Sequence, residues 1–171
     1  MDSKVERANK EKVLRRTAKL LLSAGFVRTK PTFFTRVTSL VIEFVHIHKF
    51  SFDSSFRVHL GLRVISDPFE AVALNGLNSD AYRGPESSTE KRYNFRFHES
   101  DETLDRCATN IAQFIHDVGE PWFSSCRDLS KLTSSQTSPL HMEAKAALAQ
   151  ALVGEVNTQH TAKTRELLNI P

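Results

Sequence analysis

The chain is poor in the residues and runs that mark several specialised classes of protein. Its 171 residues include 2 cysteines, 6 glycines and 1 tryptophan. Cys107 and Cys126 match no zinc-ligand spacing and are too few for a disulfide scaffold, which predicts a reducing, cytoplasmic setting. No apolar run approaches the roughly 18 to 20 residues that span a bilayer, and residues 1–12 are too charged for a signal peptide. We therefore expect neither a membrane protein nor a secreted one.

Catalytic motifs are scarce as well. The sequence holds no nucleophile elbow, no phosphate-binding glycine loop and no His-Glu helix pair. We therefore expect a protein that is not an enzyme and that uses no cofactor.

Phenylalanine, in contrast, is abundant. There are 12 phenylalanines against 2 tyrosines and 1 tryptophan, while hydrophobic residues make up 40% of the chain and charged residues 25%. Tyrosine and tryptophan are the usual anchors of interfaces, so an excess of phenylalanine predicts a packed core. The overall composition is typical of a globular domain and too apolar for a disordered chain.

The net charge of +3 conceals an uneven distribution. Residues 1–30 carry nine Lys and Arg against three Asp and Glu, whereas residues 67–105 carry four against nine. Binding to nucleic acid usually needs a dense basic surface, so this dipolar layout makes a nucleic-acid partner the weaker expectation.

Hydrophobic periodicity predicts both helices and strands. A helix over 3–23 has apolar residues three and four positions apart and ends at Gly25, which suits a left-handed C-terminal residue. A second helix starts at Ser100 or Asp101 and stops before Gly119. Alternation of apolar and polar residues predicts strands over 33–37, 40–50, 56–65 and 91–98. The acidic, turn-rich stretch 74–90 is expected to form a long, mobile loop.

These elements predict an α+β fold. An antiparallel sheet of four or more strands would pack against the N-terminal helix and the second helix, within a domain that spans 1–127. The Ser- and Thr-rich stretch 128–139 is typical of a linker. Residues 140–171 would form a helical hairpin, whose last helix Asn157 or Thr158 can cap. This hairpin would either dock on the domain or form a homodimer.

Polar residues on two of the predicted strands favour a partner-binding surface. Arg57, His59 and Arg63 share one face of strand 56–65, and alternate residues of strand 91–98 are also basic or polar. If the two rows align, they form a basic face that can bind acidic side chains or a phosphate; a merely solvated face would produce the same alternation. With three acidic residues from loop 74–90, the candidate partner-binding residues are Arg57, His59, Arg63, Arg92, Arg96, His98, Asp80, Glu86 and Glu90.

Two further patterns have functional alternatives. His46 and His48 form a His-x-His pair that, with His59 or His98 from a neighbouring strand, could hold a catalytic metal ion. We favour histidines at the edge of a core over a metal site, because the pair shares its face with apolar residues and no carboxylate recurs at a ligand-like spacing. The basic stripe of the first helix could bind RNA or could be a solvated face. That stripe consists of Lys12, Arg15, Arg16 and Lys19.

The order of motifs resembles a family of bacterial domains of unknown function, numbered 4304. The resemblance covers about residues 10–127. It is carried by Gly25-Phe26 with Arg28, Phe34-x-Arg36, the apolar strand from Val41 to Ile47, Phe56-x-Val58-x-Leu60-Gly61 and Pro121-Trp122-Phe123. The family tends to have amides where His46, His48 and His59 stand here.

The resemblance implies a small cytoplasmic domain that acts as an immunity or accessory protein. Together with the dipolar charge, it leads to the expectation of a protein-binding module that neutralises a cognate toxin by charge-complementary occlusion. A metal-dependent or small-ligand enzyme and an RNA-binding accessory protein remain the alternatives.

Overall fold

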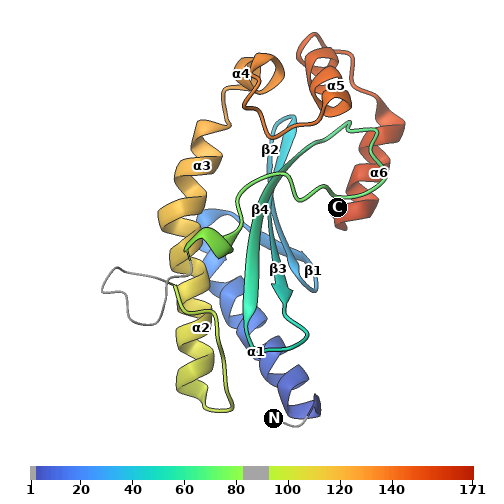
Figure 1. The fold of residues 1–171 in the computed structure, drawn as a ribbon. Helices are drawn as coiled ribbons and strands as arrows, with labels where there is room; N and C mark the ends of the chain where they lie inside the picture. The colour runs from blue at the N-terminus through green and yellow to red at the C-terminus, as the bar shows by residue number, and fades with distance from the viewer. Residues whose placement is uncertain (1–2, 83–92) are drawn as a thin grey trace.

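The structure is a computed structural model that describes residues 3–82 and 93–171 (Figure 1). Helix α1 (Ser3–Leu21) leads into a short 3-10 turn, η1 (Leu22–Ala24). The chain then reverses at Gly25, which has a φ of 80° in the left-handed region, as the sequence predicted. The fold is α+β, in agreement with the prediction.

Within the described residues, the sheet contains four antiparallel strands in the order β1-β2-β3-β4. They are β1 (Val27–Lys30), β2 (Phe33–Thr38), β3 (Val41–Lys49) and β4 (Phe56–Val64). The central position of β3 agrees with the apolar residues on both of its faces near its start. One face of β3 packs against the helices, and its opposite face points away from them.

The strand predicted at 91–98 does not form in its described part, residues 93–98. Phe95 and Phe97 are buried, as the alternation predicted, but this segment makes only an isolated bridge between Ser55 and Arg96. Further along, the outer edge of β4 is already occupied by residues 75–79, where the Leu60 amide donates to the Leu77 carbonyl over 2.8 Å. The alternation therefore predicted the burial of Phe95 and Phe97 correctly, but its prediction of a strand over 93–98 is wrong.

The second helix is longer than predicted. Ser100 caps α2 (Asp101–Phe114) by accepting a hydrogen bond from the Thr103 amide. The helix continues through a π-helical turn, η3 (Ile115–Gly119), into α3 (Glu120–Ser125), so that the three stack end to end in Figure 1. The expectation that Gly119 ends the helix is wrong. Gly119 is helical and buried, and a Cβ built on it would lie 3.3 Å from Leu60, so its small size serves packing against β4.

The main core lies between α1, α2 and one face of the sheet. It includes Val13 and Leu14 of α1, Val45 and Ile47 of β3, and Leu104 and Ile111 of α2. Phenylalanines contribute much of it, since several are completely buried: Phe26, Phe34, Phe56, Phe97, Phe114 and Phe123. Phe33 and Phe50 are only half-buried.

A buried ionic cluster connects the sheet to α3. Glu43 of β3 is 2% exposed and accepts hydrogen bonds from Arg36 Nε over 2.6 Å and from Arg127 Nε over 3.1 Å. Arg36 also donates to Glu120 over 2.8 Å, and its guanidinium lies 4.3 Å from the ring centre of Phe26. The cluster compensates a carboxylate that would otherwise be costly to bury.

The C-terminal third of the chain is helical. A short helix, α4 (Leu129–Ser134), lies in the stretch that the sequence suggested as a linker. It is followed by α5 (Met142–Leu152) and α6 (Thr158–Leu168), the second of which is capped by Asn157 as predicted. In Figure 1, α5 and α6 lie at the end of the sheet farthest from the β3–β4 turn. Among the described residues, no helix is long and apolar enough to cross a membrane.

Candidate functional site

The second face of the sheet carries a continuous row of aromatic rings. His46 pairs in register with Phe33 of β2 and with His59 of β4. Its ring centre lies 4.3 Å from that of Phe33 and 6.0 Å from that of His59, with both pairs stacked. Since Val45 and Ile47 belong to the core beneath α1, the intervening His46 faces away from the helices.

From His46 the row extends along β3 into the β3–β4 turn. Successive ring centres are 6.3 Å apart from His46 to His48, 6.2 Å from His48 to Phe50 and 5.2 Å from Phe50 to Phe52. His46 and Phe50 are half-buried and His48 is exposed, while the Phe52 side chain at the end of the row is 84% exposed. We call Phe33, His46, His48, Phe50 and Phe52 the aromatic row.

Burial keeps two histidines at the site uncharged at neutral pH. Burial, followed by repulsion from His59 and His48, lowers the pKa of His46 to about 4. Burial also lowers the pKa of His59, with Arg57 as the next cause. In the described part of the chain, the buried Nδ1 atom of His46 has no hydrogen-bond partner. A charge on this ring would therefore have little to stabilise it.

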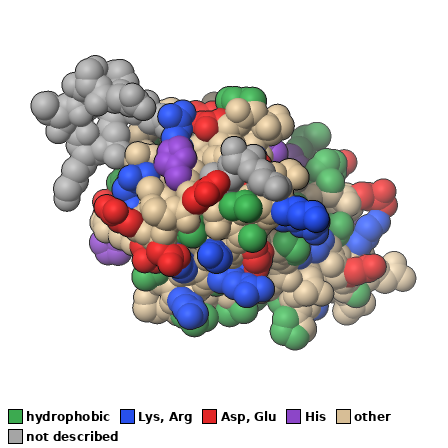
Figure 2. All heavy atoms as spheres, turned by 90° about the horizontal axis from the view of Figure 1, so that it is seen from below, with side chains coloured by type: hydrophobic (Ala, Val, Ile, Leu, Met, Phe, Trp, Pro, Cys, Tyr) green, Lys and Arg blue, Asp and Glu red, His purple; other side chains and the backbone are tan. Residues whose placement is uncertain are grey.

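The cations near the row are paired with carboxylates. Arg57 forms an ion pair with Asp80 over 2.5 Å, and its guanidinium lies 4.9 Å from the ring centre of Phe50. At the edge of the same turn, Arg96 and Asp53 are paired over 3.0 Å. Figure 2 views this end of the molecule and shows acidic side chains interspersed among the Lys and Arg side chains. The surface is thus mixed in charge instead of basic.

The described residues of the predicted basic face do not form one aligned row. Arg63 is 2% exposed, and Arg96 and His98 lie on a segment that is not a strand. Of the acidic candidates, Asp80 belongs to a short 3-10 turn, η2 (Ser79–Tyr82), beside β4. Arg92, Glu86 and Glu90 lie outside the described residues. Among the described members of the predicted set, Arg57, His59 and Asp80 lie together at one site.

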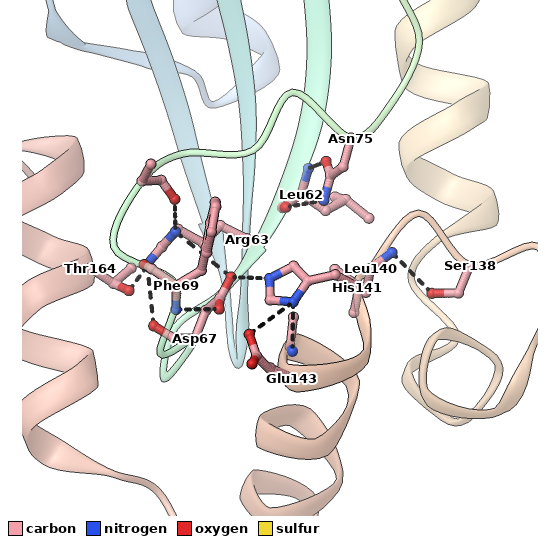
Figure 3. A network of polar contacts seen from close by, with 12 residues as sticks. Leu62, Arg63, Asp67, Phe69, Asn75, Ser138, Leu140, His141, Glu143 and Thr164 are labelled. Atoms are coloured by element: carbon pink, nitrogen blue, oxygen red, sulfur yellow. Dashed lines mark hydrogen bonds and ion pairs between the residues drawn. The ribbon is translucent and has the colours of Figure 1, made fainter.

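Arg63 instead fastens the C-terminal hairpin to the sheet, as Figure 3 shows. Its Nε donates to Thr164 Oγ1 of α6 over 2.9 Å, and its other nitrogens donate to the carbonyls of Ala71 and Phe69 over 2.6 and 2.7 Å. The carboxylate of Asp67 lies 3.7 Å away. Burial lowers the pKa of the Arg63 guanidinium, but these acceptors surround it.

A second contact in the same network involves residues that the sequence did not indicate. His141 caps α5 by accepting from the Ala144 amide at Nδ1, and its Nε2 lies 3.3 Å from Asp67 Oδ2. His141 was missed because histidine is not a preferred capping residue and Asp67 lies 74 positions earlier. The network is a structural fastening for the hairpin.

The geometry gives little support to the two alternative sites, the histidine metal site and the RNA-binding stripe of α1. His46, His48 and His59 share a face, yet within the described residues no group of three potential ligands is placed to hold a metal ion. On α1, Arg15 is paired with Glu11 over 3.0 Å, and Arg16 with Asp101 over 2.7 Å. Two members of the basic stripe are thus engaged within the protein.

A separate groove of about 450 Å³ lies at the C-terminal end of α3. Trp122, Cys126 and Lys131 contribute to its lining. Burial raises the pKa of the Cys126 thiol, which disfavours the nucleophilic thiolate. The groove therefore shows no activated nucleophile at this cysteine.

Comparisons with protein-family models, with curated proteins and with solved structures give no match to this chain. Membership of the bacterial domain family numbered 4304 stays a prediction that rests on the motifs named above. Function is therefore inferred from the geometry of the chain's own residues, and the aromatic row is the candidate site.

Proposed function

We propose that the protein is a non-enzymatic protein-binding module and that the aromatic row contacts its partner. The observation that supports this function is the exposure of Phe52 at 84%, next to the half-buried Phe50 and in line with His48. Aromatic residues are enriched at protein interfaces, where a few of them supply most of the binding energy. Exposing such rings to water in the free protein is otherwise unfavourable.

The row is also suited to binding because it is largely pre-organised. Phe33, His46 and His48 stand on paired strands, so little order has to be gained when a partner binds. The specific form that we propose is an immunity protein that neutralises a cognate toxin by occluding it. Occlusion requires a stable surface and no chemistry, which agrees with the scarcity of catalytic motifs in the sequence.

A matched pair of variants tests this proposal. Phe52→Ser removes an exposed ring from the row, whereas Met142→Ser removes an equally exposed side chain, 82%, from the start of α5. Both proteins would be compared with the wild type for protection of cells that express a candidate toxin from a neighbouring gene, and for binding to that toxin or to a protein partner retained from the source cell.

We expect Phe52→Ser to weaken binding about tenfold or more, in the range of an interface anchor, and Met142→Ser to bind like the wild type. Equal binding by all three proteins would refute a role for the row. A protein that protects against no toxin and retains no protein partner from its source cell would refute the proposed function.

A further inference from the structure

We infer that the aromatic row receives an uncharged, apolar segment of the partner and that acid releases this segment. The inference rests on the proposed function, because it assigns the chemistry and the regulation of the same surface. Three features of the row support it. The charged side chains beside the row are paired with each other, the imidazoles are stacked among other rings, and few negative groups among the described residues could balance a proton on these imidazoles.

The pairing of charges selects against a strongly acidic segment. Arg57 is the cation that contacts the row, and its partner Asp80 already lies 2.5 Å away. The guanidinium of Arg57 also lies over the Phe50 ring, so that its flat, weakly hydrated face contacts an apolar side chain. An incoming carboxylate would compete with Asp80, whereas an apolar segment would contact rings without disturbing the pair.

The surroundings of His46 favour a neutral ring. It is stacked between Phe33 at 4.3 Å and His59 at 6.0 Å, and its buried Nδ1 has no partner among residues 3–82 and 93–171. A neutral imidazole in such a stack behaves as a flat aromatic surface. An uncharged segment can therefore cover it without leaving a buried charge unpaired.

Protonation would change this surface sharply. The charged and titratable groups that act on His46 and His59 are His48 of β3, Arg57 of β4 and Asp80 of η2, while Phe33 of β2 is uncharged. Among the described residues, one carboxylate thus faces three imidazoles and a guanidinium. Protons on the imidazoles would give the row a net positive charge, and an apolar segment cannot compensate it.

The pKa shifts agree with this geometry. The pKa values of His46 and His59 are lowered by burial, so both rings are neutral at pH 7. A bound apolar segment would remove more water and oppose protonation further. By linkage, protons and the segment then compete, so affinity falls as the pH is lowered.

Two capped tripeptides provide a direct test on the intact chain. Acetyl-Leu-Phe-Leu-amide is the uncharged probe, and acetyl-Leu-Asp-Leu-amide is its acidic counterpart. Binding would be followed through the imidazole signals of His46, His48 and His59 in NMR spectra at pH 7.5 and pH 5.0. The methyl signals of Val45 and Ile47, on the opposite face of the sheet, would confirm that the fold persists.

We expect the uncharged peptide to bind more tightly at pH 7.5 and to lose about twofold or more in affinity at pH 5.0, because the covered stack excludes a proton from the imidazole of His59. The doubly substituted variant His48→Gln/His59→Gln should lose most of this pH dependence. A preference for the acidic peptide, tighter binding at pH 5.0, an unchanged pH dependence in the variant, or binding of neither peptide would overturn the inference.

This outcome is separable from the failure of the proposed function. Toxin binding by Phe52→Ser at pH 7.5 decides whether the row is the interface. The two peptides and the pH series decide which chemistry it accepts and what releases it.

Discussion

Arg63 of β4 donates its Nε–H to Thr164 Oγ1 of α6 over 2.9 Å, across 101 positions of sequence. Both side chains are almost completely buried. The pair joins the edge strand β4 to a helix near the C-terminal end of the chain. It explains why a residue that alternation assigns to a solvated face lies in the interior.

Removal of the Thr164 hydroxyl should loosen the C-terminal hairpin. In Thr164→Val the Nε–H of Arg63 is buried without its acceptor, so we expect a loss of about 1–3 kcal/mol in the free energy of unfolding. Thr161→Val is the matched control on the same helix, since Thr161 is partly exposed and its hydroxyl donates to the Asn157 carbonyl at the start of that helix. Urea unfolding measures both. Equal losses would contradict a special role for the Arg63–Thr164 pair.

Gly61 should not tolerate a side chain. A Cβ at this position would clash with Cζ of Phe44, which is completely buried on the neighbouring strand. We expect Gly61→Ala to destabilise the fold by about 1–3 kcal/mol because the core is overpacked. In a Phe44→Leu background the same substitution should cost less, and thermal unfolding of the double-mutant cycle would measure the difference. Additive costs would argue against this clash.

The charge of Glu43 should be needed for stability. Glu43→Gln leaves the guanidinium groups of Arg36 and Arg127 short of a buried negative charge, so we expect a loss of about 2–3 kcal/mol. Glu120→Gln affects a more exposed partner of Arg36 and should cost about 1 kcal/mol or less. Chemical denaturation at pH 7 compares the two. A larger effect at Glu120 would show that the cluster is centred elsewhere.

His46 should make the fold sensitive to acid. Its pKa is about 4 in the folded protein, whereas an unfolded chain has the ordinary histidine value near 6.5. Between these values the unfolded state binds the additional proton, so stability falls as the pH decreases from about 6.5 to about 4.

The variant His46→Phe removes this titration and keeps a ring beside Phe33. We expect its free energy of unfolding to depend less steeply on pH over that interval than that of the wild type. Since the pKa of His59 is also lowered, part of the dependence should remain. Identical slopes for the two proteins would show that His46 titrates normally.

The regular elements could be predicted where periodicity is strong. The long strands β3 and β4 have clear alternation, and the Ser100 cap marks the start of α2. Strand β1 escaped prediction because four residues, Val-Arg-Thr-Lys, contain too few apolar positions to show a period. The helix that continues past Gly119 was missed because a glycine can serve close packing as well as termination.

The candidate site could be predicted only in part. His46, His48 and His59 were identified from their spacing, and the register brings them together as expected for paired strands. The role of Phe50 and Phe52 was missed, because a surplus of phenylalanine indicates a core and does not reveal which rings remain outside it. Arg63 was misplaced because its covering helix follows 95 residues later in the chain. Local pattern carries no information about such a distant contact.

Asn169, just after α6, contacts the outer edge of the sheet at β1. Its side-chain amide donates to the carbonyl of Thr29 over 2.8 Å, on the edge strand β1, while residues 75–79 occupy the edge of β4. Unsatisfied strand edges recruit further strands and lead to aggregation. The residue that caps the last helix thus covers one backbone acceptor of the β1 edge, and a chain cut short before α6 would leave that acceptor open to pairing with another molecule.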